Sequence, residues 1–119
     1  MGLTYVELEV ANPARPERRS KQRFLVDSGA VYSIVGREVL DSLGIKPVRS
    51  ETFTLANGQT VERQIGNALF VFQGREGASP VIFGEEGDSL LLGMVTLESL
   101  GYVLDPFRRE LRPLPMILG

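Results

Sequence analysis

An apolar run followed by a short helical segment occurs twice in this chain, and this repeat constrains the fold more than any other feature of the sequence. Residues 36–45 and 93–102 share Gly, Leu, Ser, Leu and Gly at equivalent places, and Asp41 corresponds to Glu98. The shared Leu-x-Ser-Leu-Gly is by itself a common helix ending, but the shared leading glycine and preceding apolar run favour a duplicated strand–helix unit. Two such units, related by an approximate twofold axis, would bury two equivalent apolar faces in one core.

The other segments are short and β-prone, which predicts a mainly β domain with two short helices. A length of 119 residues suits a single domain, 1–119, whose core we expect at about 3–113. Alternating or continuous apolar runs predict strands, and helical spacing ahead of Gly44 and Gly101 predicts helices. The expected strands are 3–11, 22–27, 31–35, 52–56, 60–65, 68–73, 80–83, a fully buried 90–92, 102–105 and 110–111, and the expected helices are 37–43 and 93–100.

Two connections carry specific predictions. Asn57-Gly58 lies between polar, β-prone segments and indicates a hairpin, because a type I′ turn needs positive φ at both central residues. This hairpin has few large apolar side chains, so we expect it to project from the domain. The stretch 15–23 is basic, but Glu17 interrupts it and no aromatic residue is present. We therefore interpret it as an exposed hairpin loop rather than a site for an anionic partner.

The composition excludes several chemistries because the chain has no histidine and no cysteine. Disulfides, thiolate zinc sites, cysteine nucleophiles and imidazole bases are impossible, which leaves carboxylate, hydroxyl, lysine and tyrosine chemistry. The formal net charge of −2 argues against a nucleic-acid partner. Short apolar runs and an N-terminus without a signal-peptide pattern predict a soluble, cytoplasmic protein with no membrane partner. We expect no cofactor and no metal.

Asp27 is placed differently from the other carboxylates. It follows the apolar run Phe24-Leu25-Val26 and precedes Ser28-Gly29-Ala30, so it should end a buried strand on a tight turn of small residues. Burial there is costly unless the carboxylate is hydrogen-bonded or shares a proton. An isolated Asp-Ser-Gly, however, is most often an aspartate that caps its own turn.

The surroundings of Asp27 resemble the active-site segment of the retropepsin-like aspartic proteases. Residues 24–35, Phe-Leu-Val-Asp-Ser-Gly-Ala-Val-Tyr-Ser-Ile-Val, are similar to the apolar strand that enters Asp-Thr/Ser-Gly-Ala in that family. Leu91-Leu92-Gly93 and the helix behind it resemble the family's apolar-apolar-Gly strand and short helix, at a spacing that suits a protomer of retroviral size. The hairpin around Asn57-Gly58 stands where the family has its projecting flap. The resemblance covers about residues 3–113.

The resemblance implies a closed β-barrel and a homodimeric aspartic endopeptidase that acts on peptide or protein substrates. Because the chain has one Asp-Ser-Gly, each protomer would supply one Asp27 of a pair of carboxylates that share a proton. By resemblance, Ser28 would link the two active-site loops, and Gly29 would let the substrate backbone approach closely. The substrate-binding residues implied are Ala30, Val31, Leu55, Ala56, Asn57 and Gly58.

Three features depart from the family pattern. Val31 and Tyr32 stand where retroviral proteases commonly have a further aspartate that binds substrate backbone. The flap tip is polar rather than glycine-rich and apolar. The apolar segment 113–119 contains prolines, which remove ladder donors, so it is either a strand of the dimer interface or a tail that packs on its own protomer.

Two other interpretations remain open. One is a binding module that keeps the fold and groove but does not cleave, which the polar flap and Val31 favour. The other is an unrelated small β-barrel in which Asp27 only caps a turn, but this leaves the second unit, Leu91-Leu92-Gly93, unexplained. The intact Asp27-Ser28-Gly29 favours the enzyme, because a binding groove has no need for a buried carboxylate at this turn.

Overall fold

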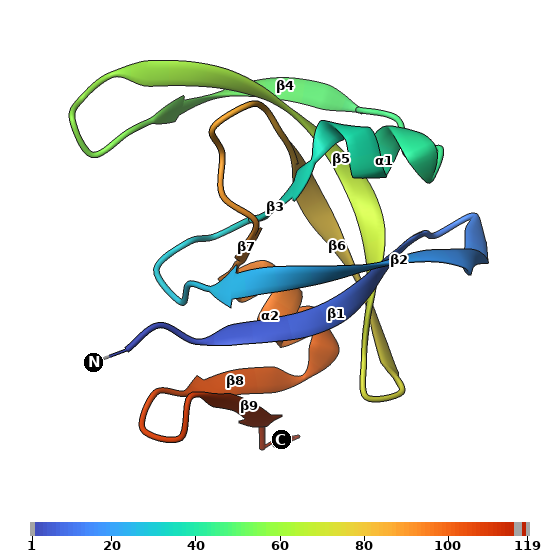
Figure 1. Ribbon diagram of the computed structural model, residues 1–119, viewed down its shortest axis with the longest axis vertical. Helices are drawn as coiled ribbons and strands as arrows, with labels where there is room; N and C mark the ends of the chain where they lie inside the picture. The colour runs from blue at the N-terminus through green and yellow to red at the C-terminus, as the bar shows by residue number, and fades with distance from the viewer. Residues whose placement is uncertain (1, 116–117, 119) are drawn as a thin grey trace.

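The computed structural model describes residues 2–115 and 118, which form a mainly β domain with two short helices (Figure 1). The strands are β1 (Tyr5–Asn12), β2 (Arg15–Val26), β3 (Ser33–Gly36), β4 (Arg49–Thr54), β5 (Thr60–Phe72), β6 (Arg75–Gly84), β7 (Leu91–Leu92), β8 (Tyr102–Asp105) and β9 (Glu110–Pro113), and the helices are α1 (Arg37–Ser42) and α2 (Met94–Leu100). The prediction of a mainly β domain with two short helices is confirmed. Within the described residues, no helix is long and apolar enough to cross a membrane.

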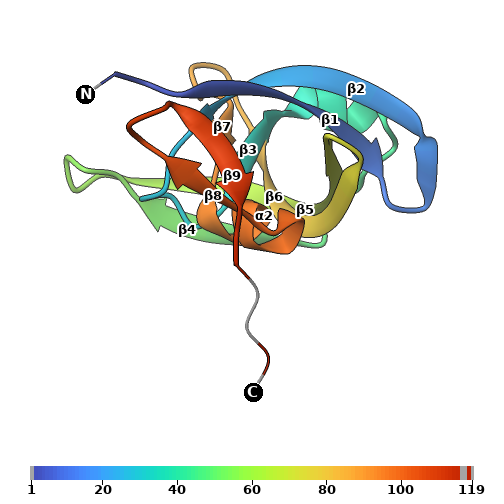
Figure 2. The same cartoon turned by 90° about the horizontal axis from the view of Figure 1, so that it is seen from below.

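Seven strands form one sheet in the order β1-β2-β7-β3-β6-β5-β4, and an additional pairing of β1 with β5 closes the pairings into a ring that leaves β4 outside. At the centre, β3 pairs antiparallel with β7, while β3 runs parallel to β6 and β7 runs parallel to β2. The two halves of this arrangement are equivalent, as the sequence repeat predicts. A separate hairpin of β8 and β9 forms the base of the domain (Figures 1 and 2).

Equivalent residues of the repeat are buried in the same core. A glycine with a φ of 76° lies just beyond each helix, after the C-cap Leu43 in α1 and directly after Leu100 in α2. Such a left-handed residue closes a helix at little cost only when it is glycine. The matched pairs are Leu40 with Leu97, Leu43 with Leu100, and Gly44 with Gly101, and all four leucines are buried.

The basic stretch lies in a strand, so our interpretation of it as a hairpin loop is wrong. β2 begins at Arg15, and only residues 13–14 make the turn, where Asn12 Oδ1 accepts a hydrogen bond from the Ala14 N–H (2.9 Å). The long charged side chains lie on an exposed face, where Arg19 pairs with Glu9 (3.3 Å). A strand with a solvated face accepts such residues, which is why apolar alternation did not detect it.

The turn at the tip of the β4–β5 hairpin differs from the predicted type I′ turn, because only Gly58 has positive φ (86°). The Gly58 N–H donates to the Leu55 carbonyl (2.9 Å), and Asn57 Oδ1 accepts from the Gln59 N–H (2.9 Å). The side chain of Asn57 thus stabilises an ordinary conformation of its own backbone. The hairpin itself projects from the domain, as predicted (Figure 1).

Two segments around the centre of the sheet differ from expectation. Residues 31 and 32 are bends, so β3 begins two residues later than predicted, at Ser33. Of the segment 90–92, only Leu92 is buried, because Leu91 borders a pocket described below.

Candidate active site

The loop between β2 and β3, residues 27–32, carries Asp27 on the side of the domain where the hairpin tip projects (Figure 1). The Asp27 N–H donates to the Leu92 carbonyl of β7 (3.0 Å), and the Asp27 carbonyl accepts from the Ala30 N–H (3.1 Å). The chain therefore turns directly after β2 and exposes Ser28 and Gly29. The predicted site residues 27–31 form one continuous segment of this loop.

One oxygen of the Asp27 carboxylate is engaged by the turn and the other is not. Oδ1 accepts a hydrogen bond from the Gly29 N–H at 2.9 Å, whereas Oδ2 accepts none from the residues described. A Cβ at Gly29 would lie 3.3 Å from Oδ1, so the glycine leaves room for the carboxylate. The side chain is partly exposed in the single chain, which corrects the expectation of burial. The turn-capping role is therefore real but occupies half of the carboxylate.

The junction of β7 and α2 supports the loop from behind. The N–H groups of Met94 and Val95 donate to the carbonyls of Ala30 (2.8 Å) and Val31 (3.0 Å), so loop oxygens satisfy the first donors of α2. Gly93 lies against the loop so closely that a Cβ there would be 2.6 Å from the Tyr32 carbonyl oxygen. The two segments that the sequence analysis singled out, 24–35 and 91–93, are therefore packed together.

A mostly apolar pocket of about 360 Å³ lies between the loop, the central strands and β4. Two of the predicted substrate-binding residues, Ala30 and Val31, line this pocket, whereas the predicted residues 55–58 lie at the exposed hairpin tip and are not among its lining. Phe53 is the one aromatic residue in β4, where less exposed and exposed side chains alternate, and this pattern could have identified it. The lining residues that sequence reasoning missed are Tyr32, Ile34, Phe53, Ile82 and Leu91.

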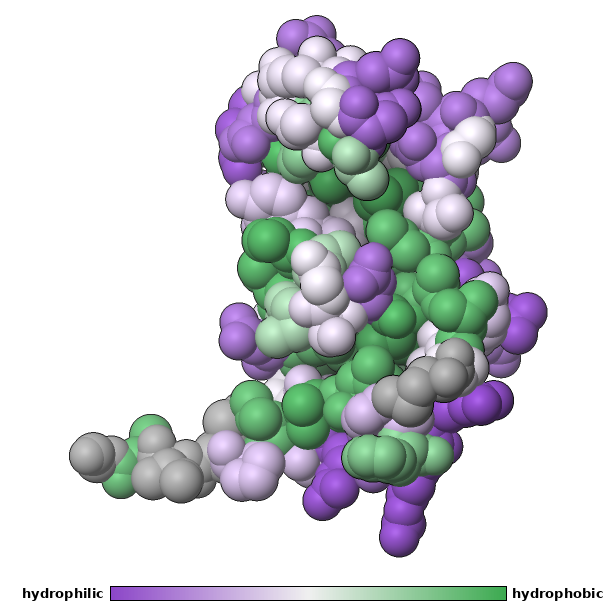
Figure 3. Space-filling model, turned by 90° about the vertical axis from the view of Figure 1, so that its left-hand side faces the viewer, coloured by the Kyte–Doolittle hydropathy of each residue, from purple (hydrophilic) through white to green (hydrophobic). Residues whose placement is uncertain are grey.

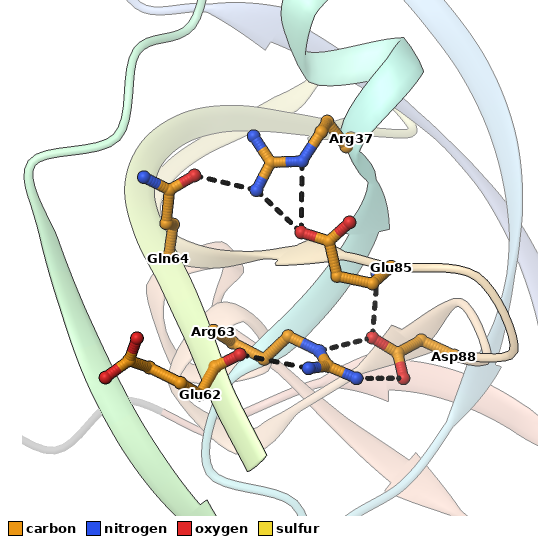
Figure 4. Close-up of polar contacts among 6 residues, drawn as sticks. All are labelled: Arg37, Glu62, Arg63, Gln64, Glu85 and Asp88. Carbon is orange, nitrogen blue, oxygen red and sulfur yellow. Dashed lines mark hydrogen bonds and ion pairs between the residues drawn. The ribbon is translucent and has the colours of Figure 1, made fainter.

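A network of charged residues fixes the base of the hairpin (Figure 4). Arg63 of β5 makes two hydrogen bonds to Asp88 (2.8 and 3.1 Å), and Arg37 contacts both Glu85 (2.6 Å) and Gln64 (2.7 Å). The hydrogen bonds from Arg63 lower the pKa of Asp88, and those from Arg37 lower the pKa of Glu85. The loop 85–90 is thereby tied to the strand that carries the hairpin.

The second unit of the repeat has a glycine at the place of Asp27. In the parallel pair of β2 and β7, Asp27 follows the partner of Leu92, and in the equivalent pair of β6 and β3, Gly84 follows the partner of Val35. A Cβ at Gly84 would lie 2.9 Å from Ile34 Cγ2. One chain therefore presents one carboxylate at the two equivalent positions. Among the residues described, no group of three or more Asp and Glu side chains could hold a metal ion.

Comparison with known proteins identifies the family. Residues 13–96, which include the Asp27 loop, match the family model described as aspartyl protease. The chain belongs to the aspartyl protease family. It is an aspartic-type peptidase, so the interpretation as an unrelated β-barrel is wrong. No curated protein matches the chain in sequence.

Solved structures show that this peptidase has a retropepsin-like fold. The solution structure of the simian foamy virus (mac) protease has a TM-score of 0.53 and 20% identity, with 78% of this chain and 92% of that chain covered. The crystal structure of a retropepsin-like aspartic protease from Rickettsia conorii has a TM-score of 0.55 and 24% identity, with 87% of this chain and 77% of that chain covered.

Proposed function

We propose that this peptidase is a homodimeric endopeptidase in which two copies of Asp27 activate a water molecule between them. The observation that carries the proposal is the Asp27 loop with its unengaged Oδ2 in a chain whose equivalent second loop has Gly84 instead. Peptide hydrolysis of this kind needs two carboxylates with opposite protonation states. A second copy of the same chain supplies the missing carboxylate across a twofold axis.

The surface around the loop supports such a dimer. Figure 3 shows hydrophobic residues gathered over much of this face, below the polar hairpin tip. An apolar pocket of about 340 Å³ lies beside Ser28, between α2 and β8, and Val31 is 60% exposed. Contiguous apolar surface of this kind marks an interaction site. In the proposed dimer, the exposed Ser28 hydroxyl links the two active-site loops.

The chemistry follows from two carboxylates that share one proton, because like charges in contact cannot both ionise cheaply. The ionised Asp27 takes a proton from water as the water oxygen attacks the scissile carbonyl carbon, and the protonated Asp27 of the partner donates a hydrogen bond to the carbonyl oxygen. The tetrahedral intermediate then collapses. Its C–N bond breaks as the nitrogen receives a proton from an Asp27 carboxyl group, which leaves one proton on the pair.

Extended peptides with apolar side chains are the substrates that the cleft suits best. The pocket lined by Phe53 accepts one such side chain next to Ala30, and residues 55–58 at the hairpin tip close over the peptide and exclude water.

We propose that residues 1–119 form the single domain that contains this half-site, and that the protein acts in the cytoplasm. Leu114 still packs on its own protomer, since its N–H donates to the Gly101 carbonyl (2.8 Å). Residues 116, 117 and 119 of the expected dimer strand or tail lie outside those described.

The test compares Asp27→Asn with Asp41→Asn, an exposed aspartate on α1 that serves as the control. Both variants and the wild type are incubated with a random-sequence peptide library at pH 3–8, and new termini are found by mass spectrometry. We expect Asp27→Asn to lose about 10³-fold or more of the cleavage rate, and Asp41→Asn to keep it. Equal cleavage by all three would contradict the assignment. Tight binding of a statine-containing peptide without any cleavage by the wild type would favour the binding module.

A further inference from the structure

Three buried hydroxyl groups form a chain directly behind the active-site loop. Ser33 and Thr96 are 0% exposed and Ser79 is 3% exposed, and they come from β3, α2 and β6. Thr96 Oγ1 lies 2.5 Å from Ser33 Oγ and 2.8 Å from Ser79 Oγ. Thr96 is thus the only one of the three that contacts both of the others within the described structure.

The Ser79 end of this hydroxyl chain fixes the direction of every hydrogen bond in it. Ser79 Oγ donates to the Pro80 carbonyl (3.0 Å), and Ser33 Oγ accepts from the Gly93 N–H (2.9 Å). A hydroxyl group has one proton to donate. Ser79 must therefore accept from Thr96, and Thr96 must accept from Ser33. Every hydroxyl in the chain donates once and accepts once, an arrangement in which each bond strengthens the next.

The hydroxyl chain ends at Gly93, the residue against which the active-site loop packs. Gly93 lies against the backbone of Tyr32, and the residues on either side of it bond to the loop, Leu92 to Asp27 and Met94 to Ala30. A shift of Gly93 therefore moves the backbone that carries Asp27. The hydroxyl of Thr96 links this junction to β6, the strand that pairs with β3.

Packing alone does not explain a threonine at this position. Valine has nearly the same shape and needs no hydrogen bonds, whereas a fully buried hydroxyl is costly unless all its partners are in place. A buried polar group with every bond satisfied holds one arrangement of the surrounding segments. The buried hydroxyl of Thr96 therefore contributes a fixed position of the loop rather than better packing of the core.

We propose that Thr96 is a positioning residue, whose hydroxyl sets the place of Asp27 and hence the geometry of the two carboxylates in the dimer. This inference rests on the proposed function. The proposal predicts that removal of the hydroxyl lowers kcat more than it changes KM.

The experiment compares Thr96→Val, Thr96→Ser and Val10→Ala in the full-length protein. Thr96→Val deletes the hydroxyl, Thr96→Ser keeps it, and Val10→Ala removes methyl groups from a fully buried site in β1. The substrate is the best-cleaved peptide of the library above, assayed well below the unfolding temperatures. We expect Thr96→Val to lower kcat about 10-fold or more with KM changed less than about twofold, since misplacement of a reacting group costs rate. Thr96→Ser should restore most of kcat, and Val10→Ala should lose stability but not kcat.

Amide hydrogen exchange of the loop gives a second measurement that needs no activity. Thr96→Val should speed exchange of the amides of Ala30, Met94 and Val95 relative to Val10→Ala. If Thr96→Val does not fold, Ser79→Ala, which breaks the hydroxyl chain at its other end, replaces it in both assays.

Wild-type kcat in a folded Thr96→Val, or a kcat loss that Thr96→Ser does not rescue, would overturn the proposal while the proposed function stands. If the wild type cleaves nothing, the proposed function fails instead, and exchange decides whether Thr96 holds the loop. Unchanged exchange of the three amides would then overturn the positioning role as well.

Discussion

Gly93 and Gly36 occupy equivalent places in the repeat, and a methyl group added to each should have opposite effects. Both residues precede a helix with φ values that any residue adopts, −98° and −56°. A Cβ at Gly36 would meet nothing within 4 Å, whereas a Cβ at Gly93 would lie 2.6 Å from the Tyr32 carbonyl oxygen and 2.9 Å from that of Val31. These contacts are with backbone, which has no rotamer through which to move away.

The expected magnitudes follow from this difference. Gly36→Ala reduces the freedom of the unfolded chain, which favours folding by about 0.4–1 kcal/mol, offset in part by the weaker N-cap. Gly93→Ala gains the same entropic benefit but overpacks the junction, at a cost of about 1–3 kcal/mol or more. For a domain of this size, 1 kcal/mol corresponds to roughly 4 °C in Tm. The two variants should therefore differ by about 4–12 °C.

Thermal unfolding followed by circular dichroism, at one protein concentration for all samples, measures this difference. Peptide cleavage measured on the same samples should fall at least 10-fold in Gly93→Ala, because the methyl group displaces the backbone of the Asp27 loop. Gly36→Ala should cleave at the wild-type rate. Equal Tm values and equal cleavage in the two variants would refute the close packing of β7 and α2 against the loop.

The ion pair of Arg63 with Asp88 should make stability depend on pH. Because Arg63 lowers the pKa of folded Asp88, the unfolded chain takes up the proton at a higher pH, so the stabilisation is complete above about pH 4 and is lost as pH falls through the folded pKa. Asp88→Asn should lower the free energy of unfolding in urea by about 1–2 kcal/mol at pH 6 and should flatten its dependence on acid pH. An unchanged dependence of the unfolding free energy on pH would exclude the pair. Specific activity should fall on dilution below the dimer dissociation constant, whereas concentration-independent activity from a sedimenting monomer would exclude a shared site. The pH–rate profile should be bell-shaped with an acidic maximum, and a rate that climbs steadily through pH 8 would rule out the carboxylate pair.

Features that repeat or that follow a simple period could be predicted from the sequence. The two helices, their terminal glycines and the buried leucines Leu40 and Leu97 all follow from apolar spacing and a left-handed glycine. Solvated segments were harder to predict, because their backbone conformation depends on partners far along the chain. The first half of β2 pairs with β1 although its side chains are charged, and Asn57 folds its own turn through its side chain.

The candidate site likewise has a part that the sequence predicts and a part that it does not. Asp27 can be found from its apolar strand and the small residues after it, but the tripeptide has two structural roles, and only the structure shows that capping the turn engages Oδ1 and leaves Oδ2 without a bond from the described chain. The buried hydroxyl groups behind the loop leave no sequence signal, because Ser33, Ser79 and Thr96 lie on three elements that are far apart in the sequence. In the proposed dimer, the Asp27 carboxylate would meet its copy across the twofold axis and would need its backbone fixed within a fraction of an ångström. The positioning role that we propose for Thr96 would account for a fully bonded hydroxyl chain behind the loop, at a site where valine would satisfy the core.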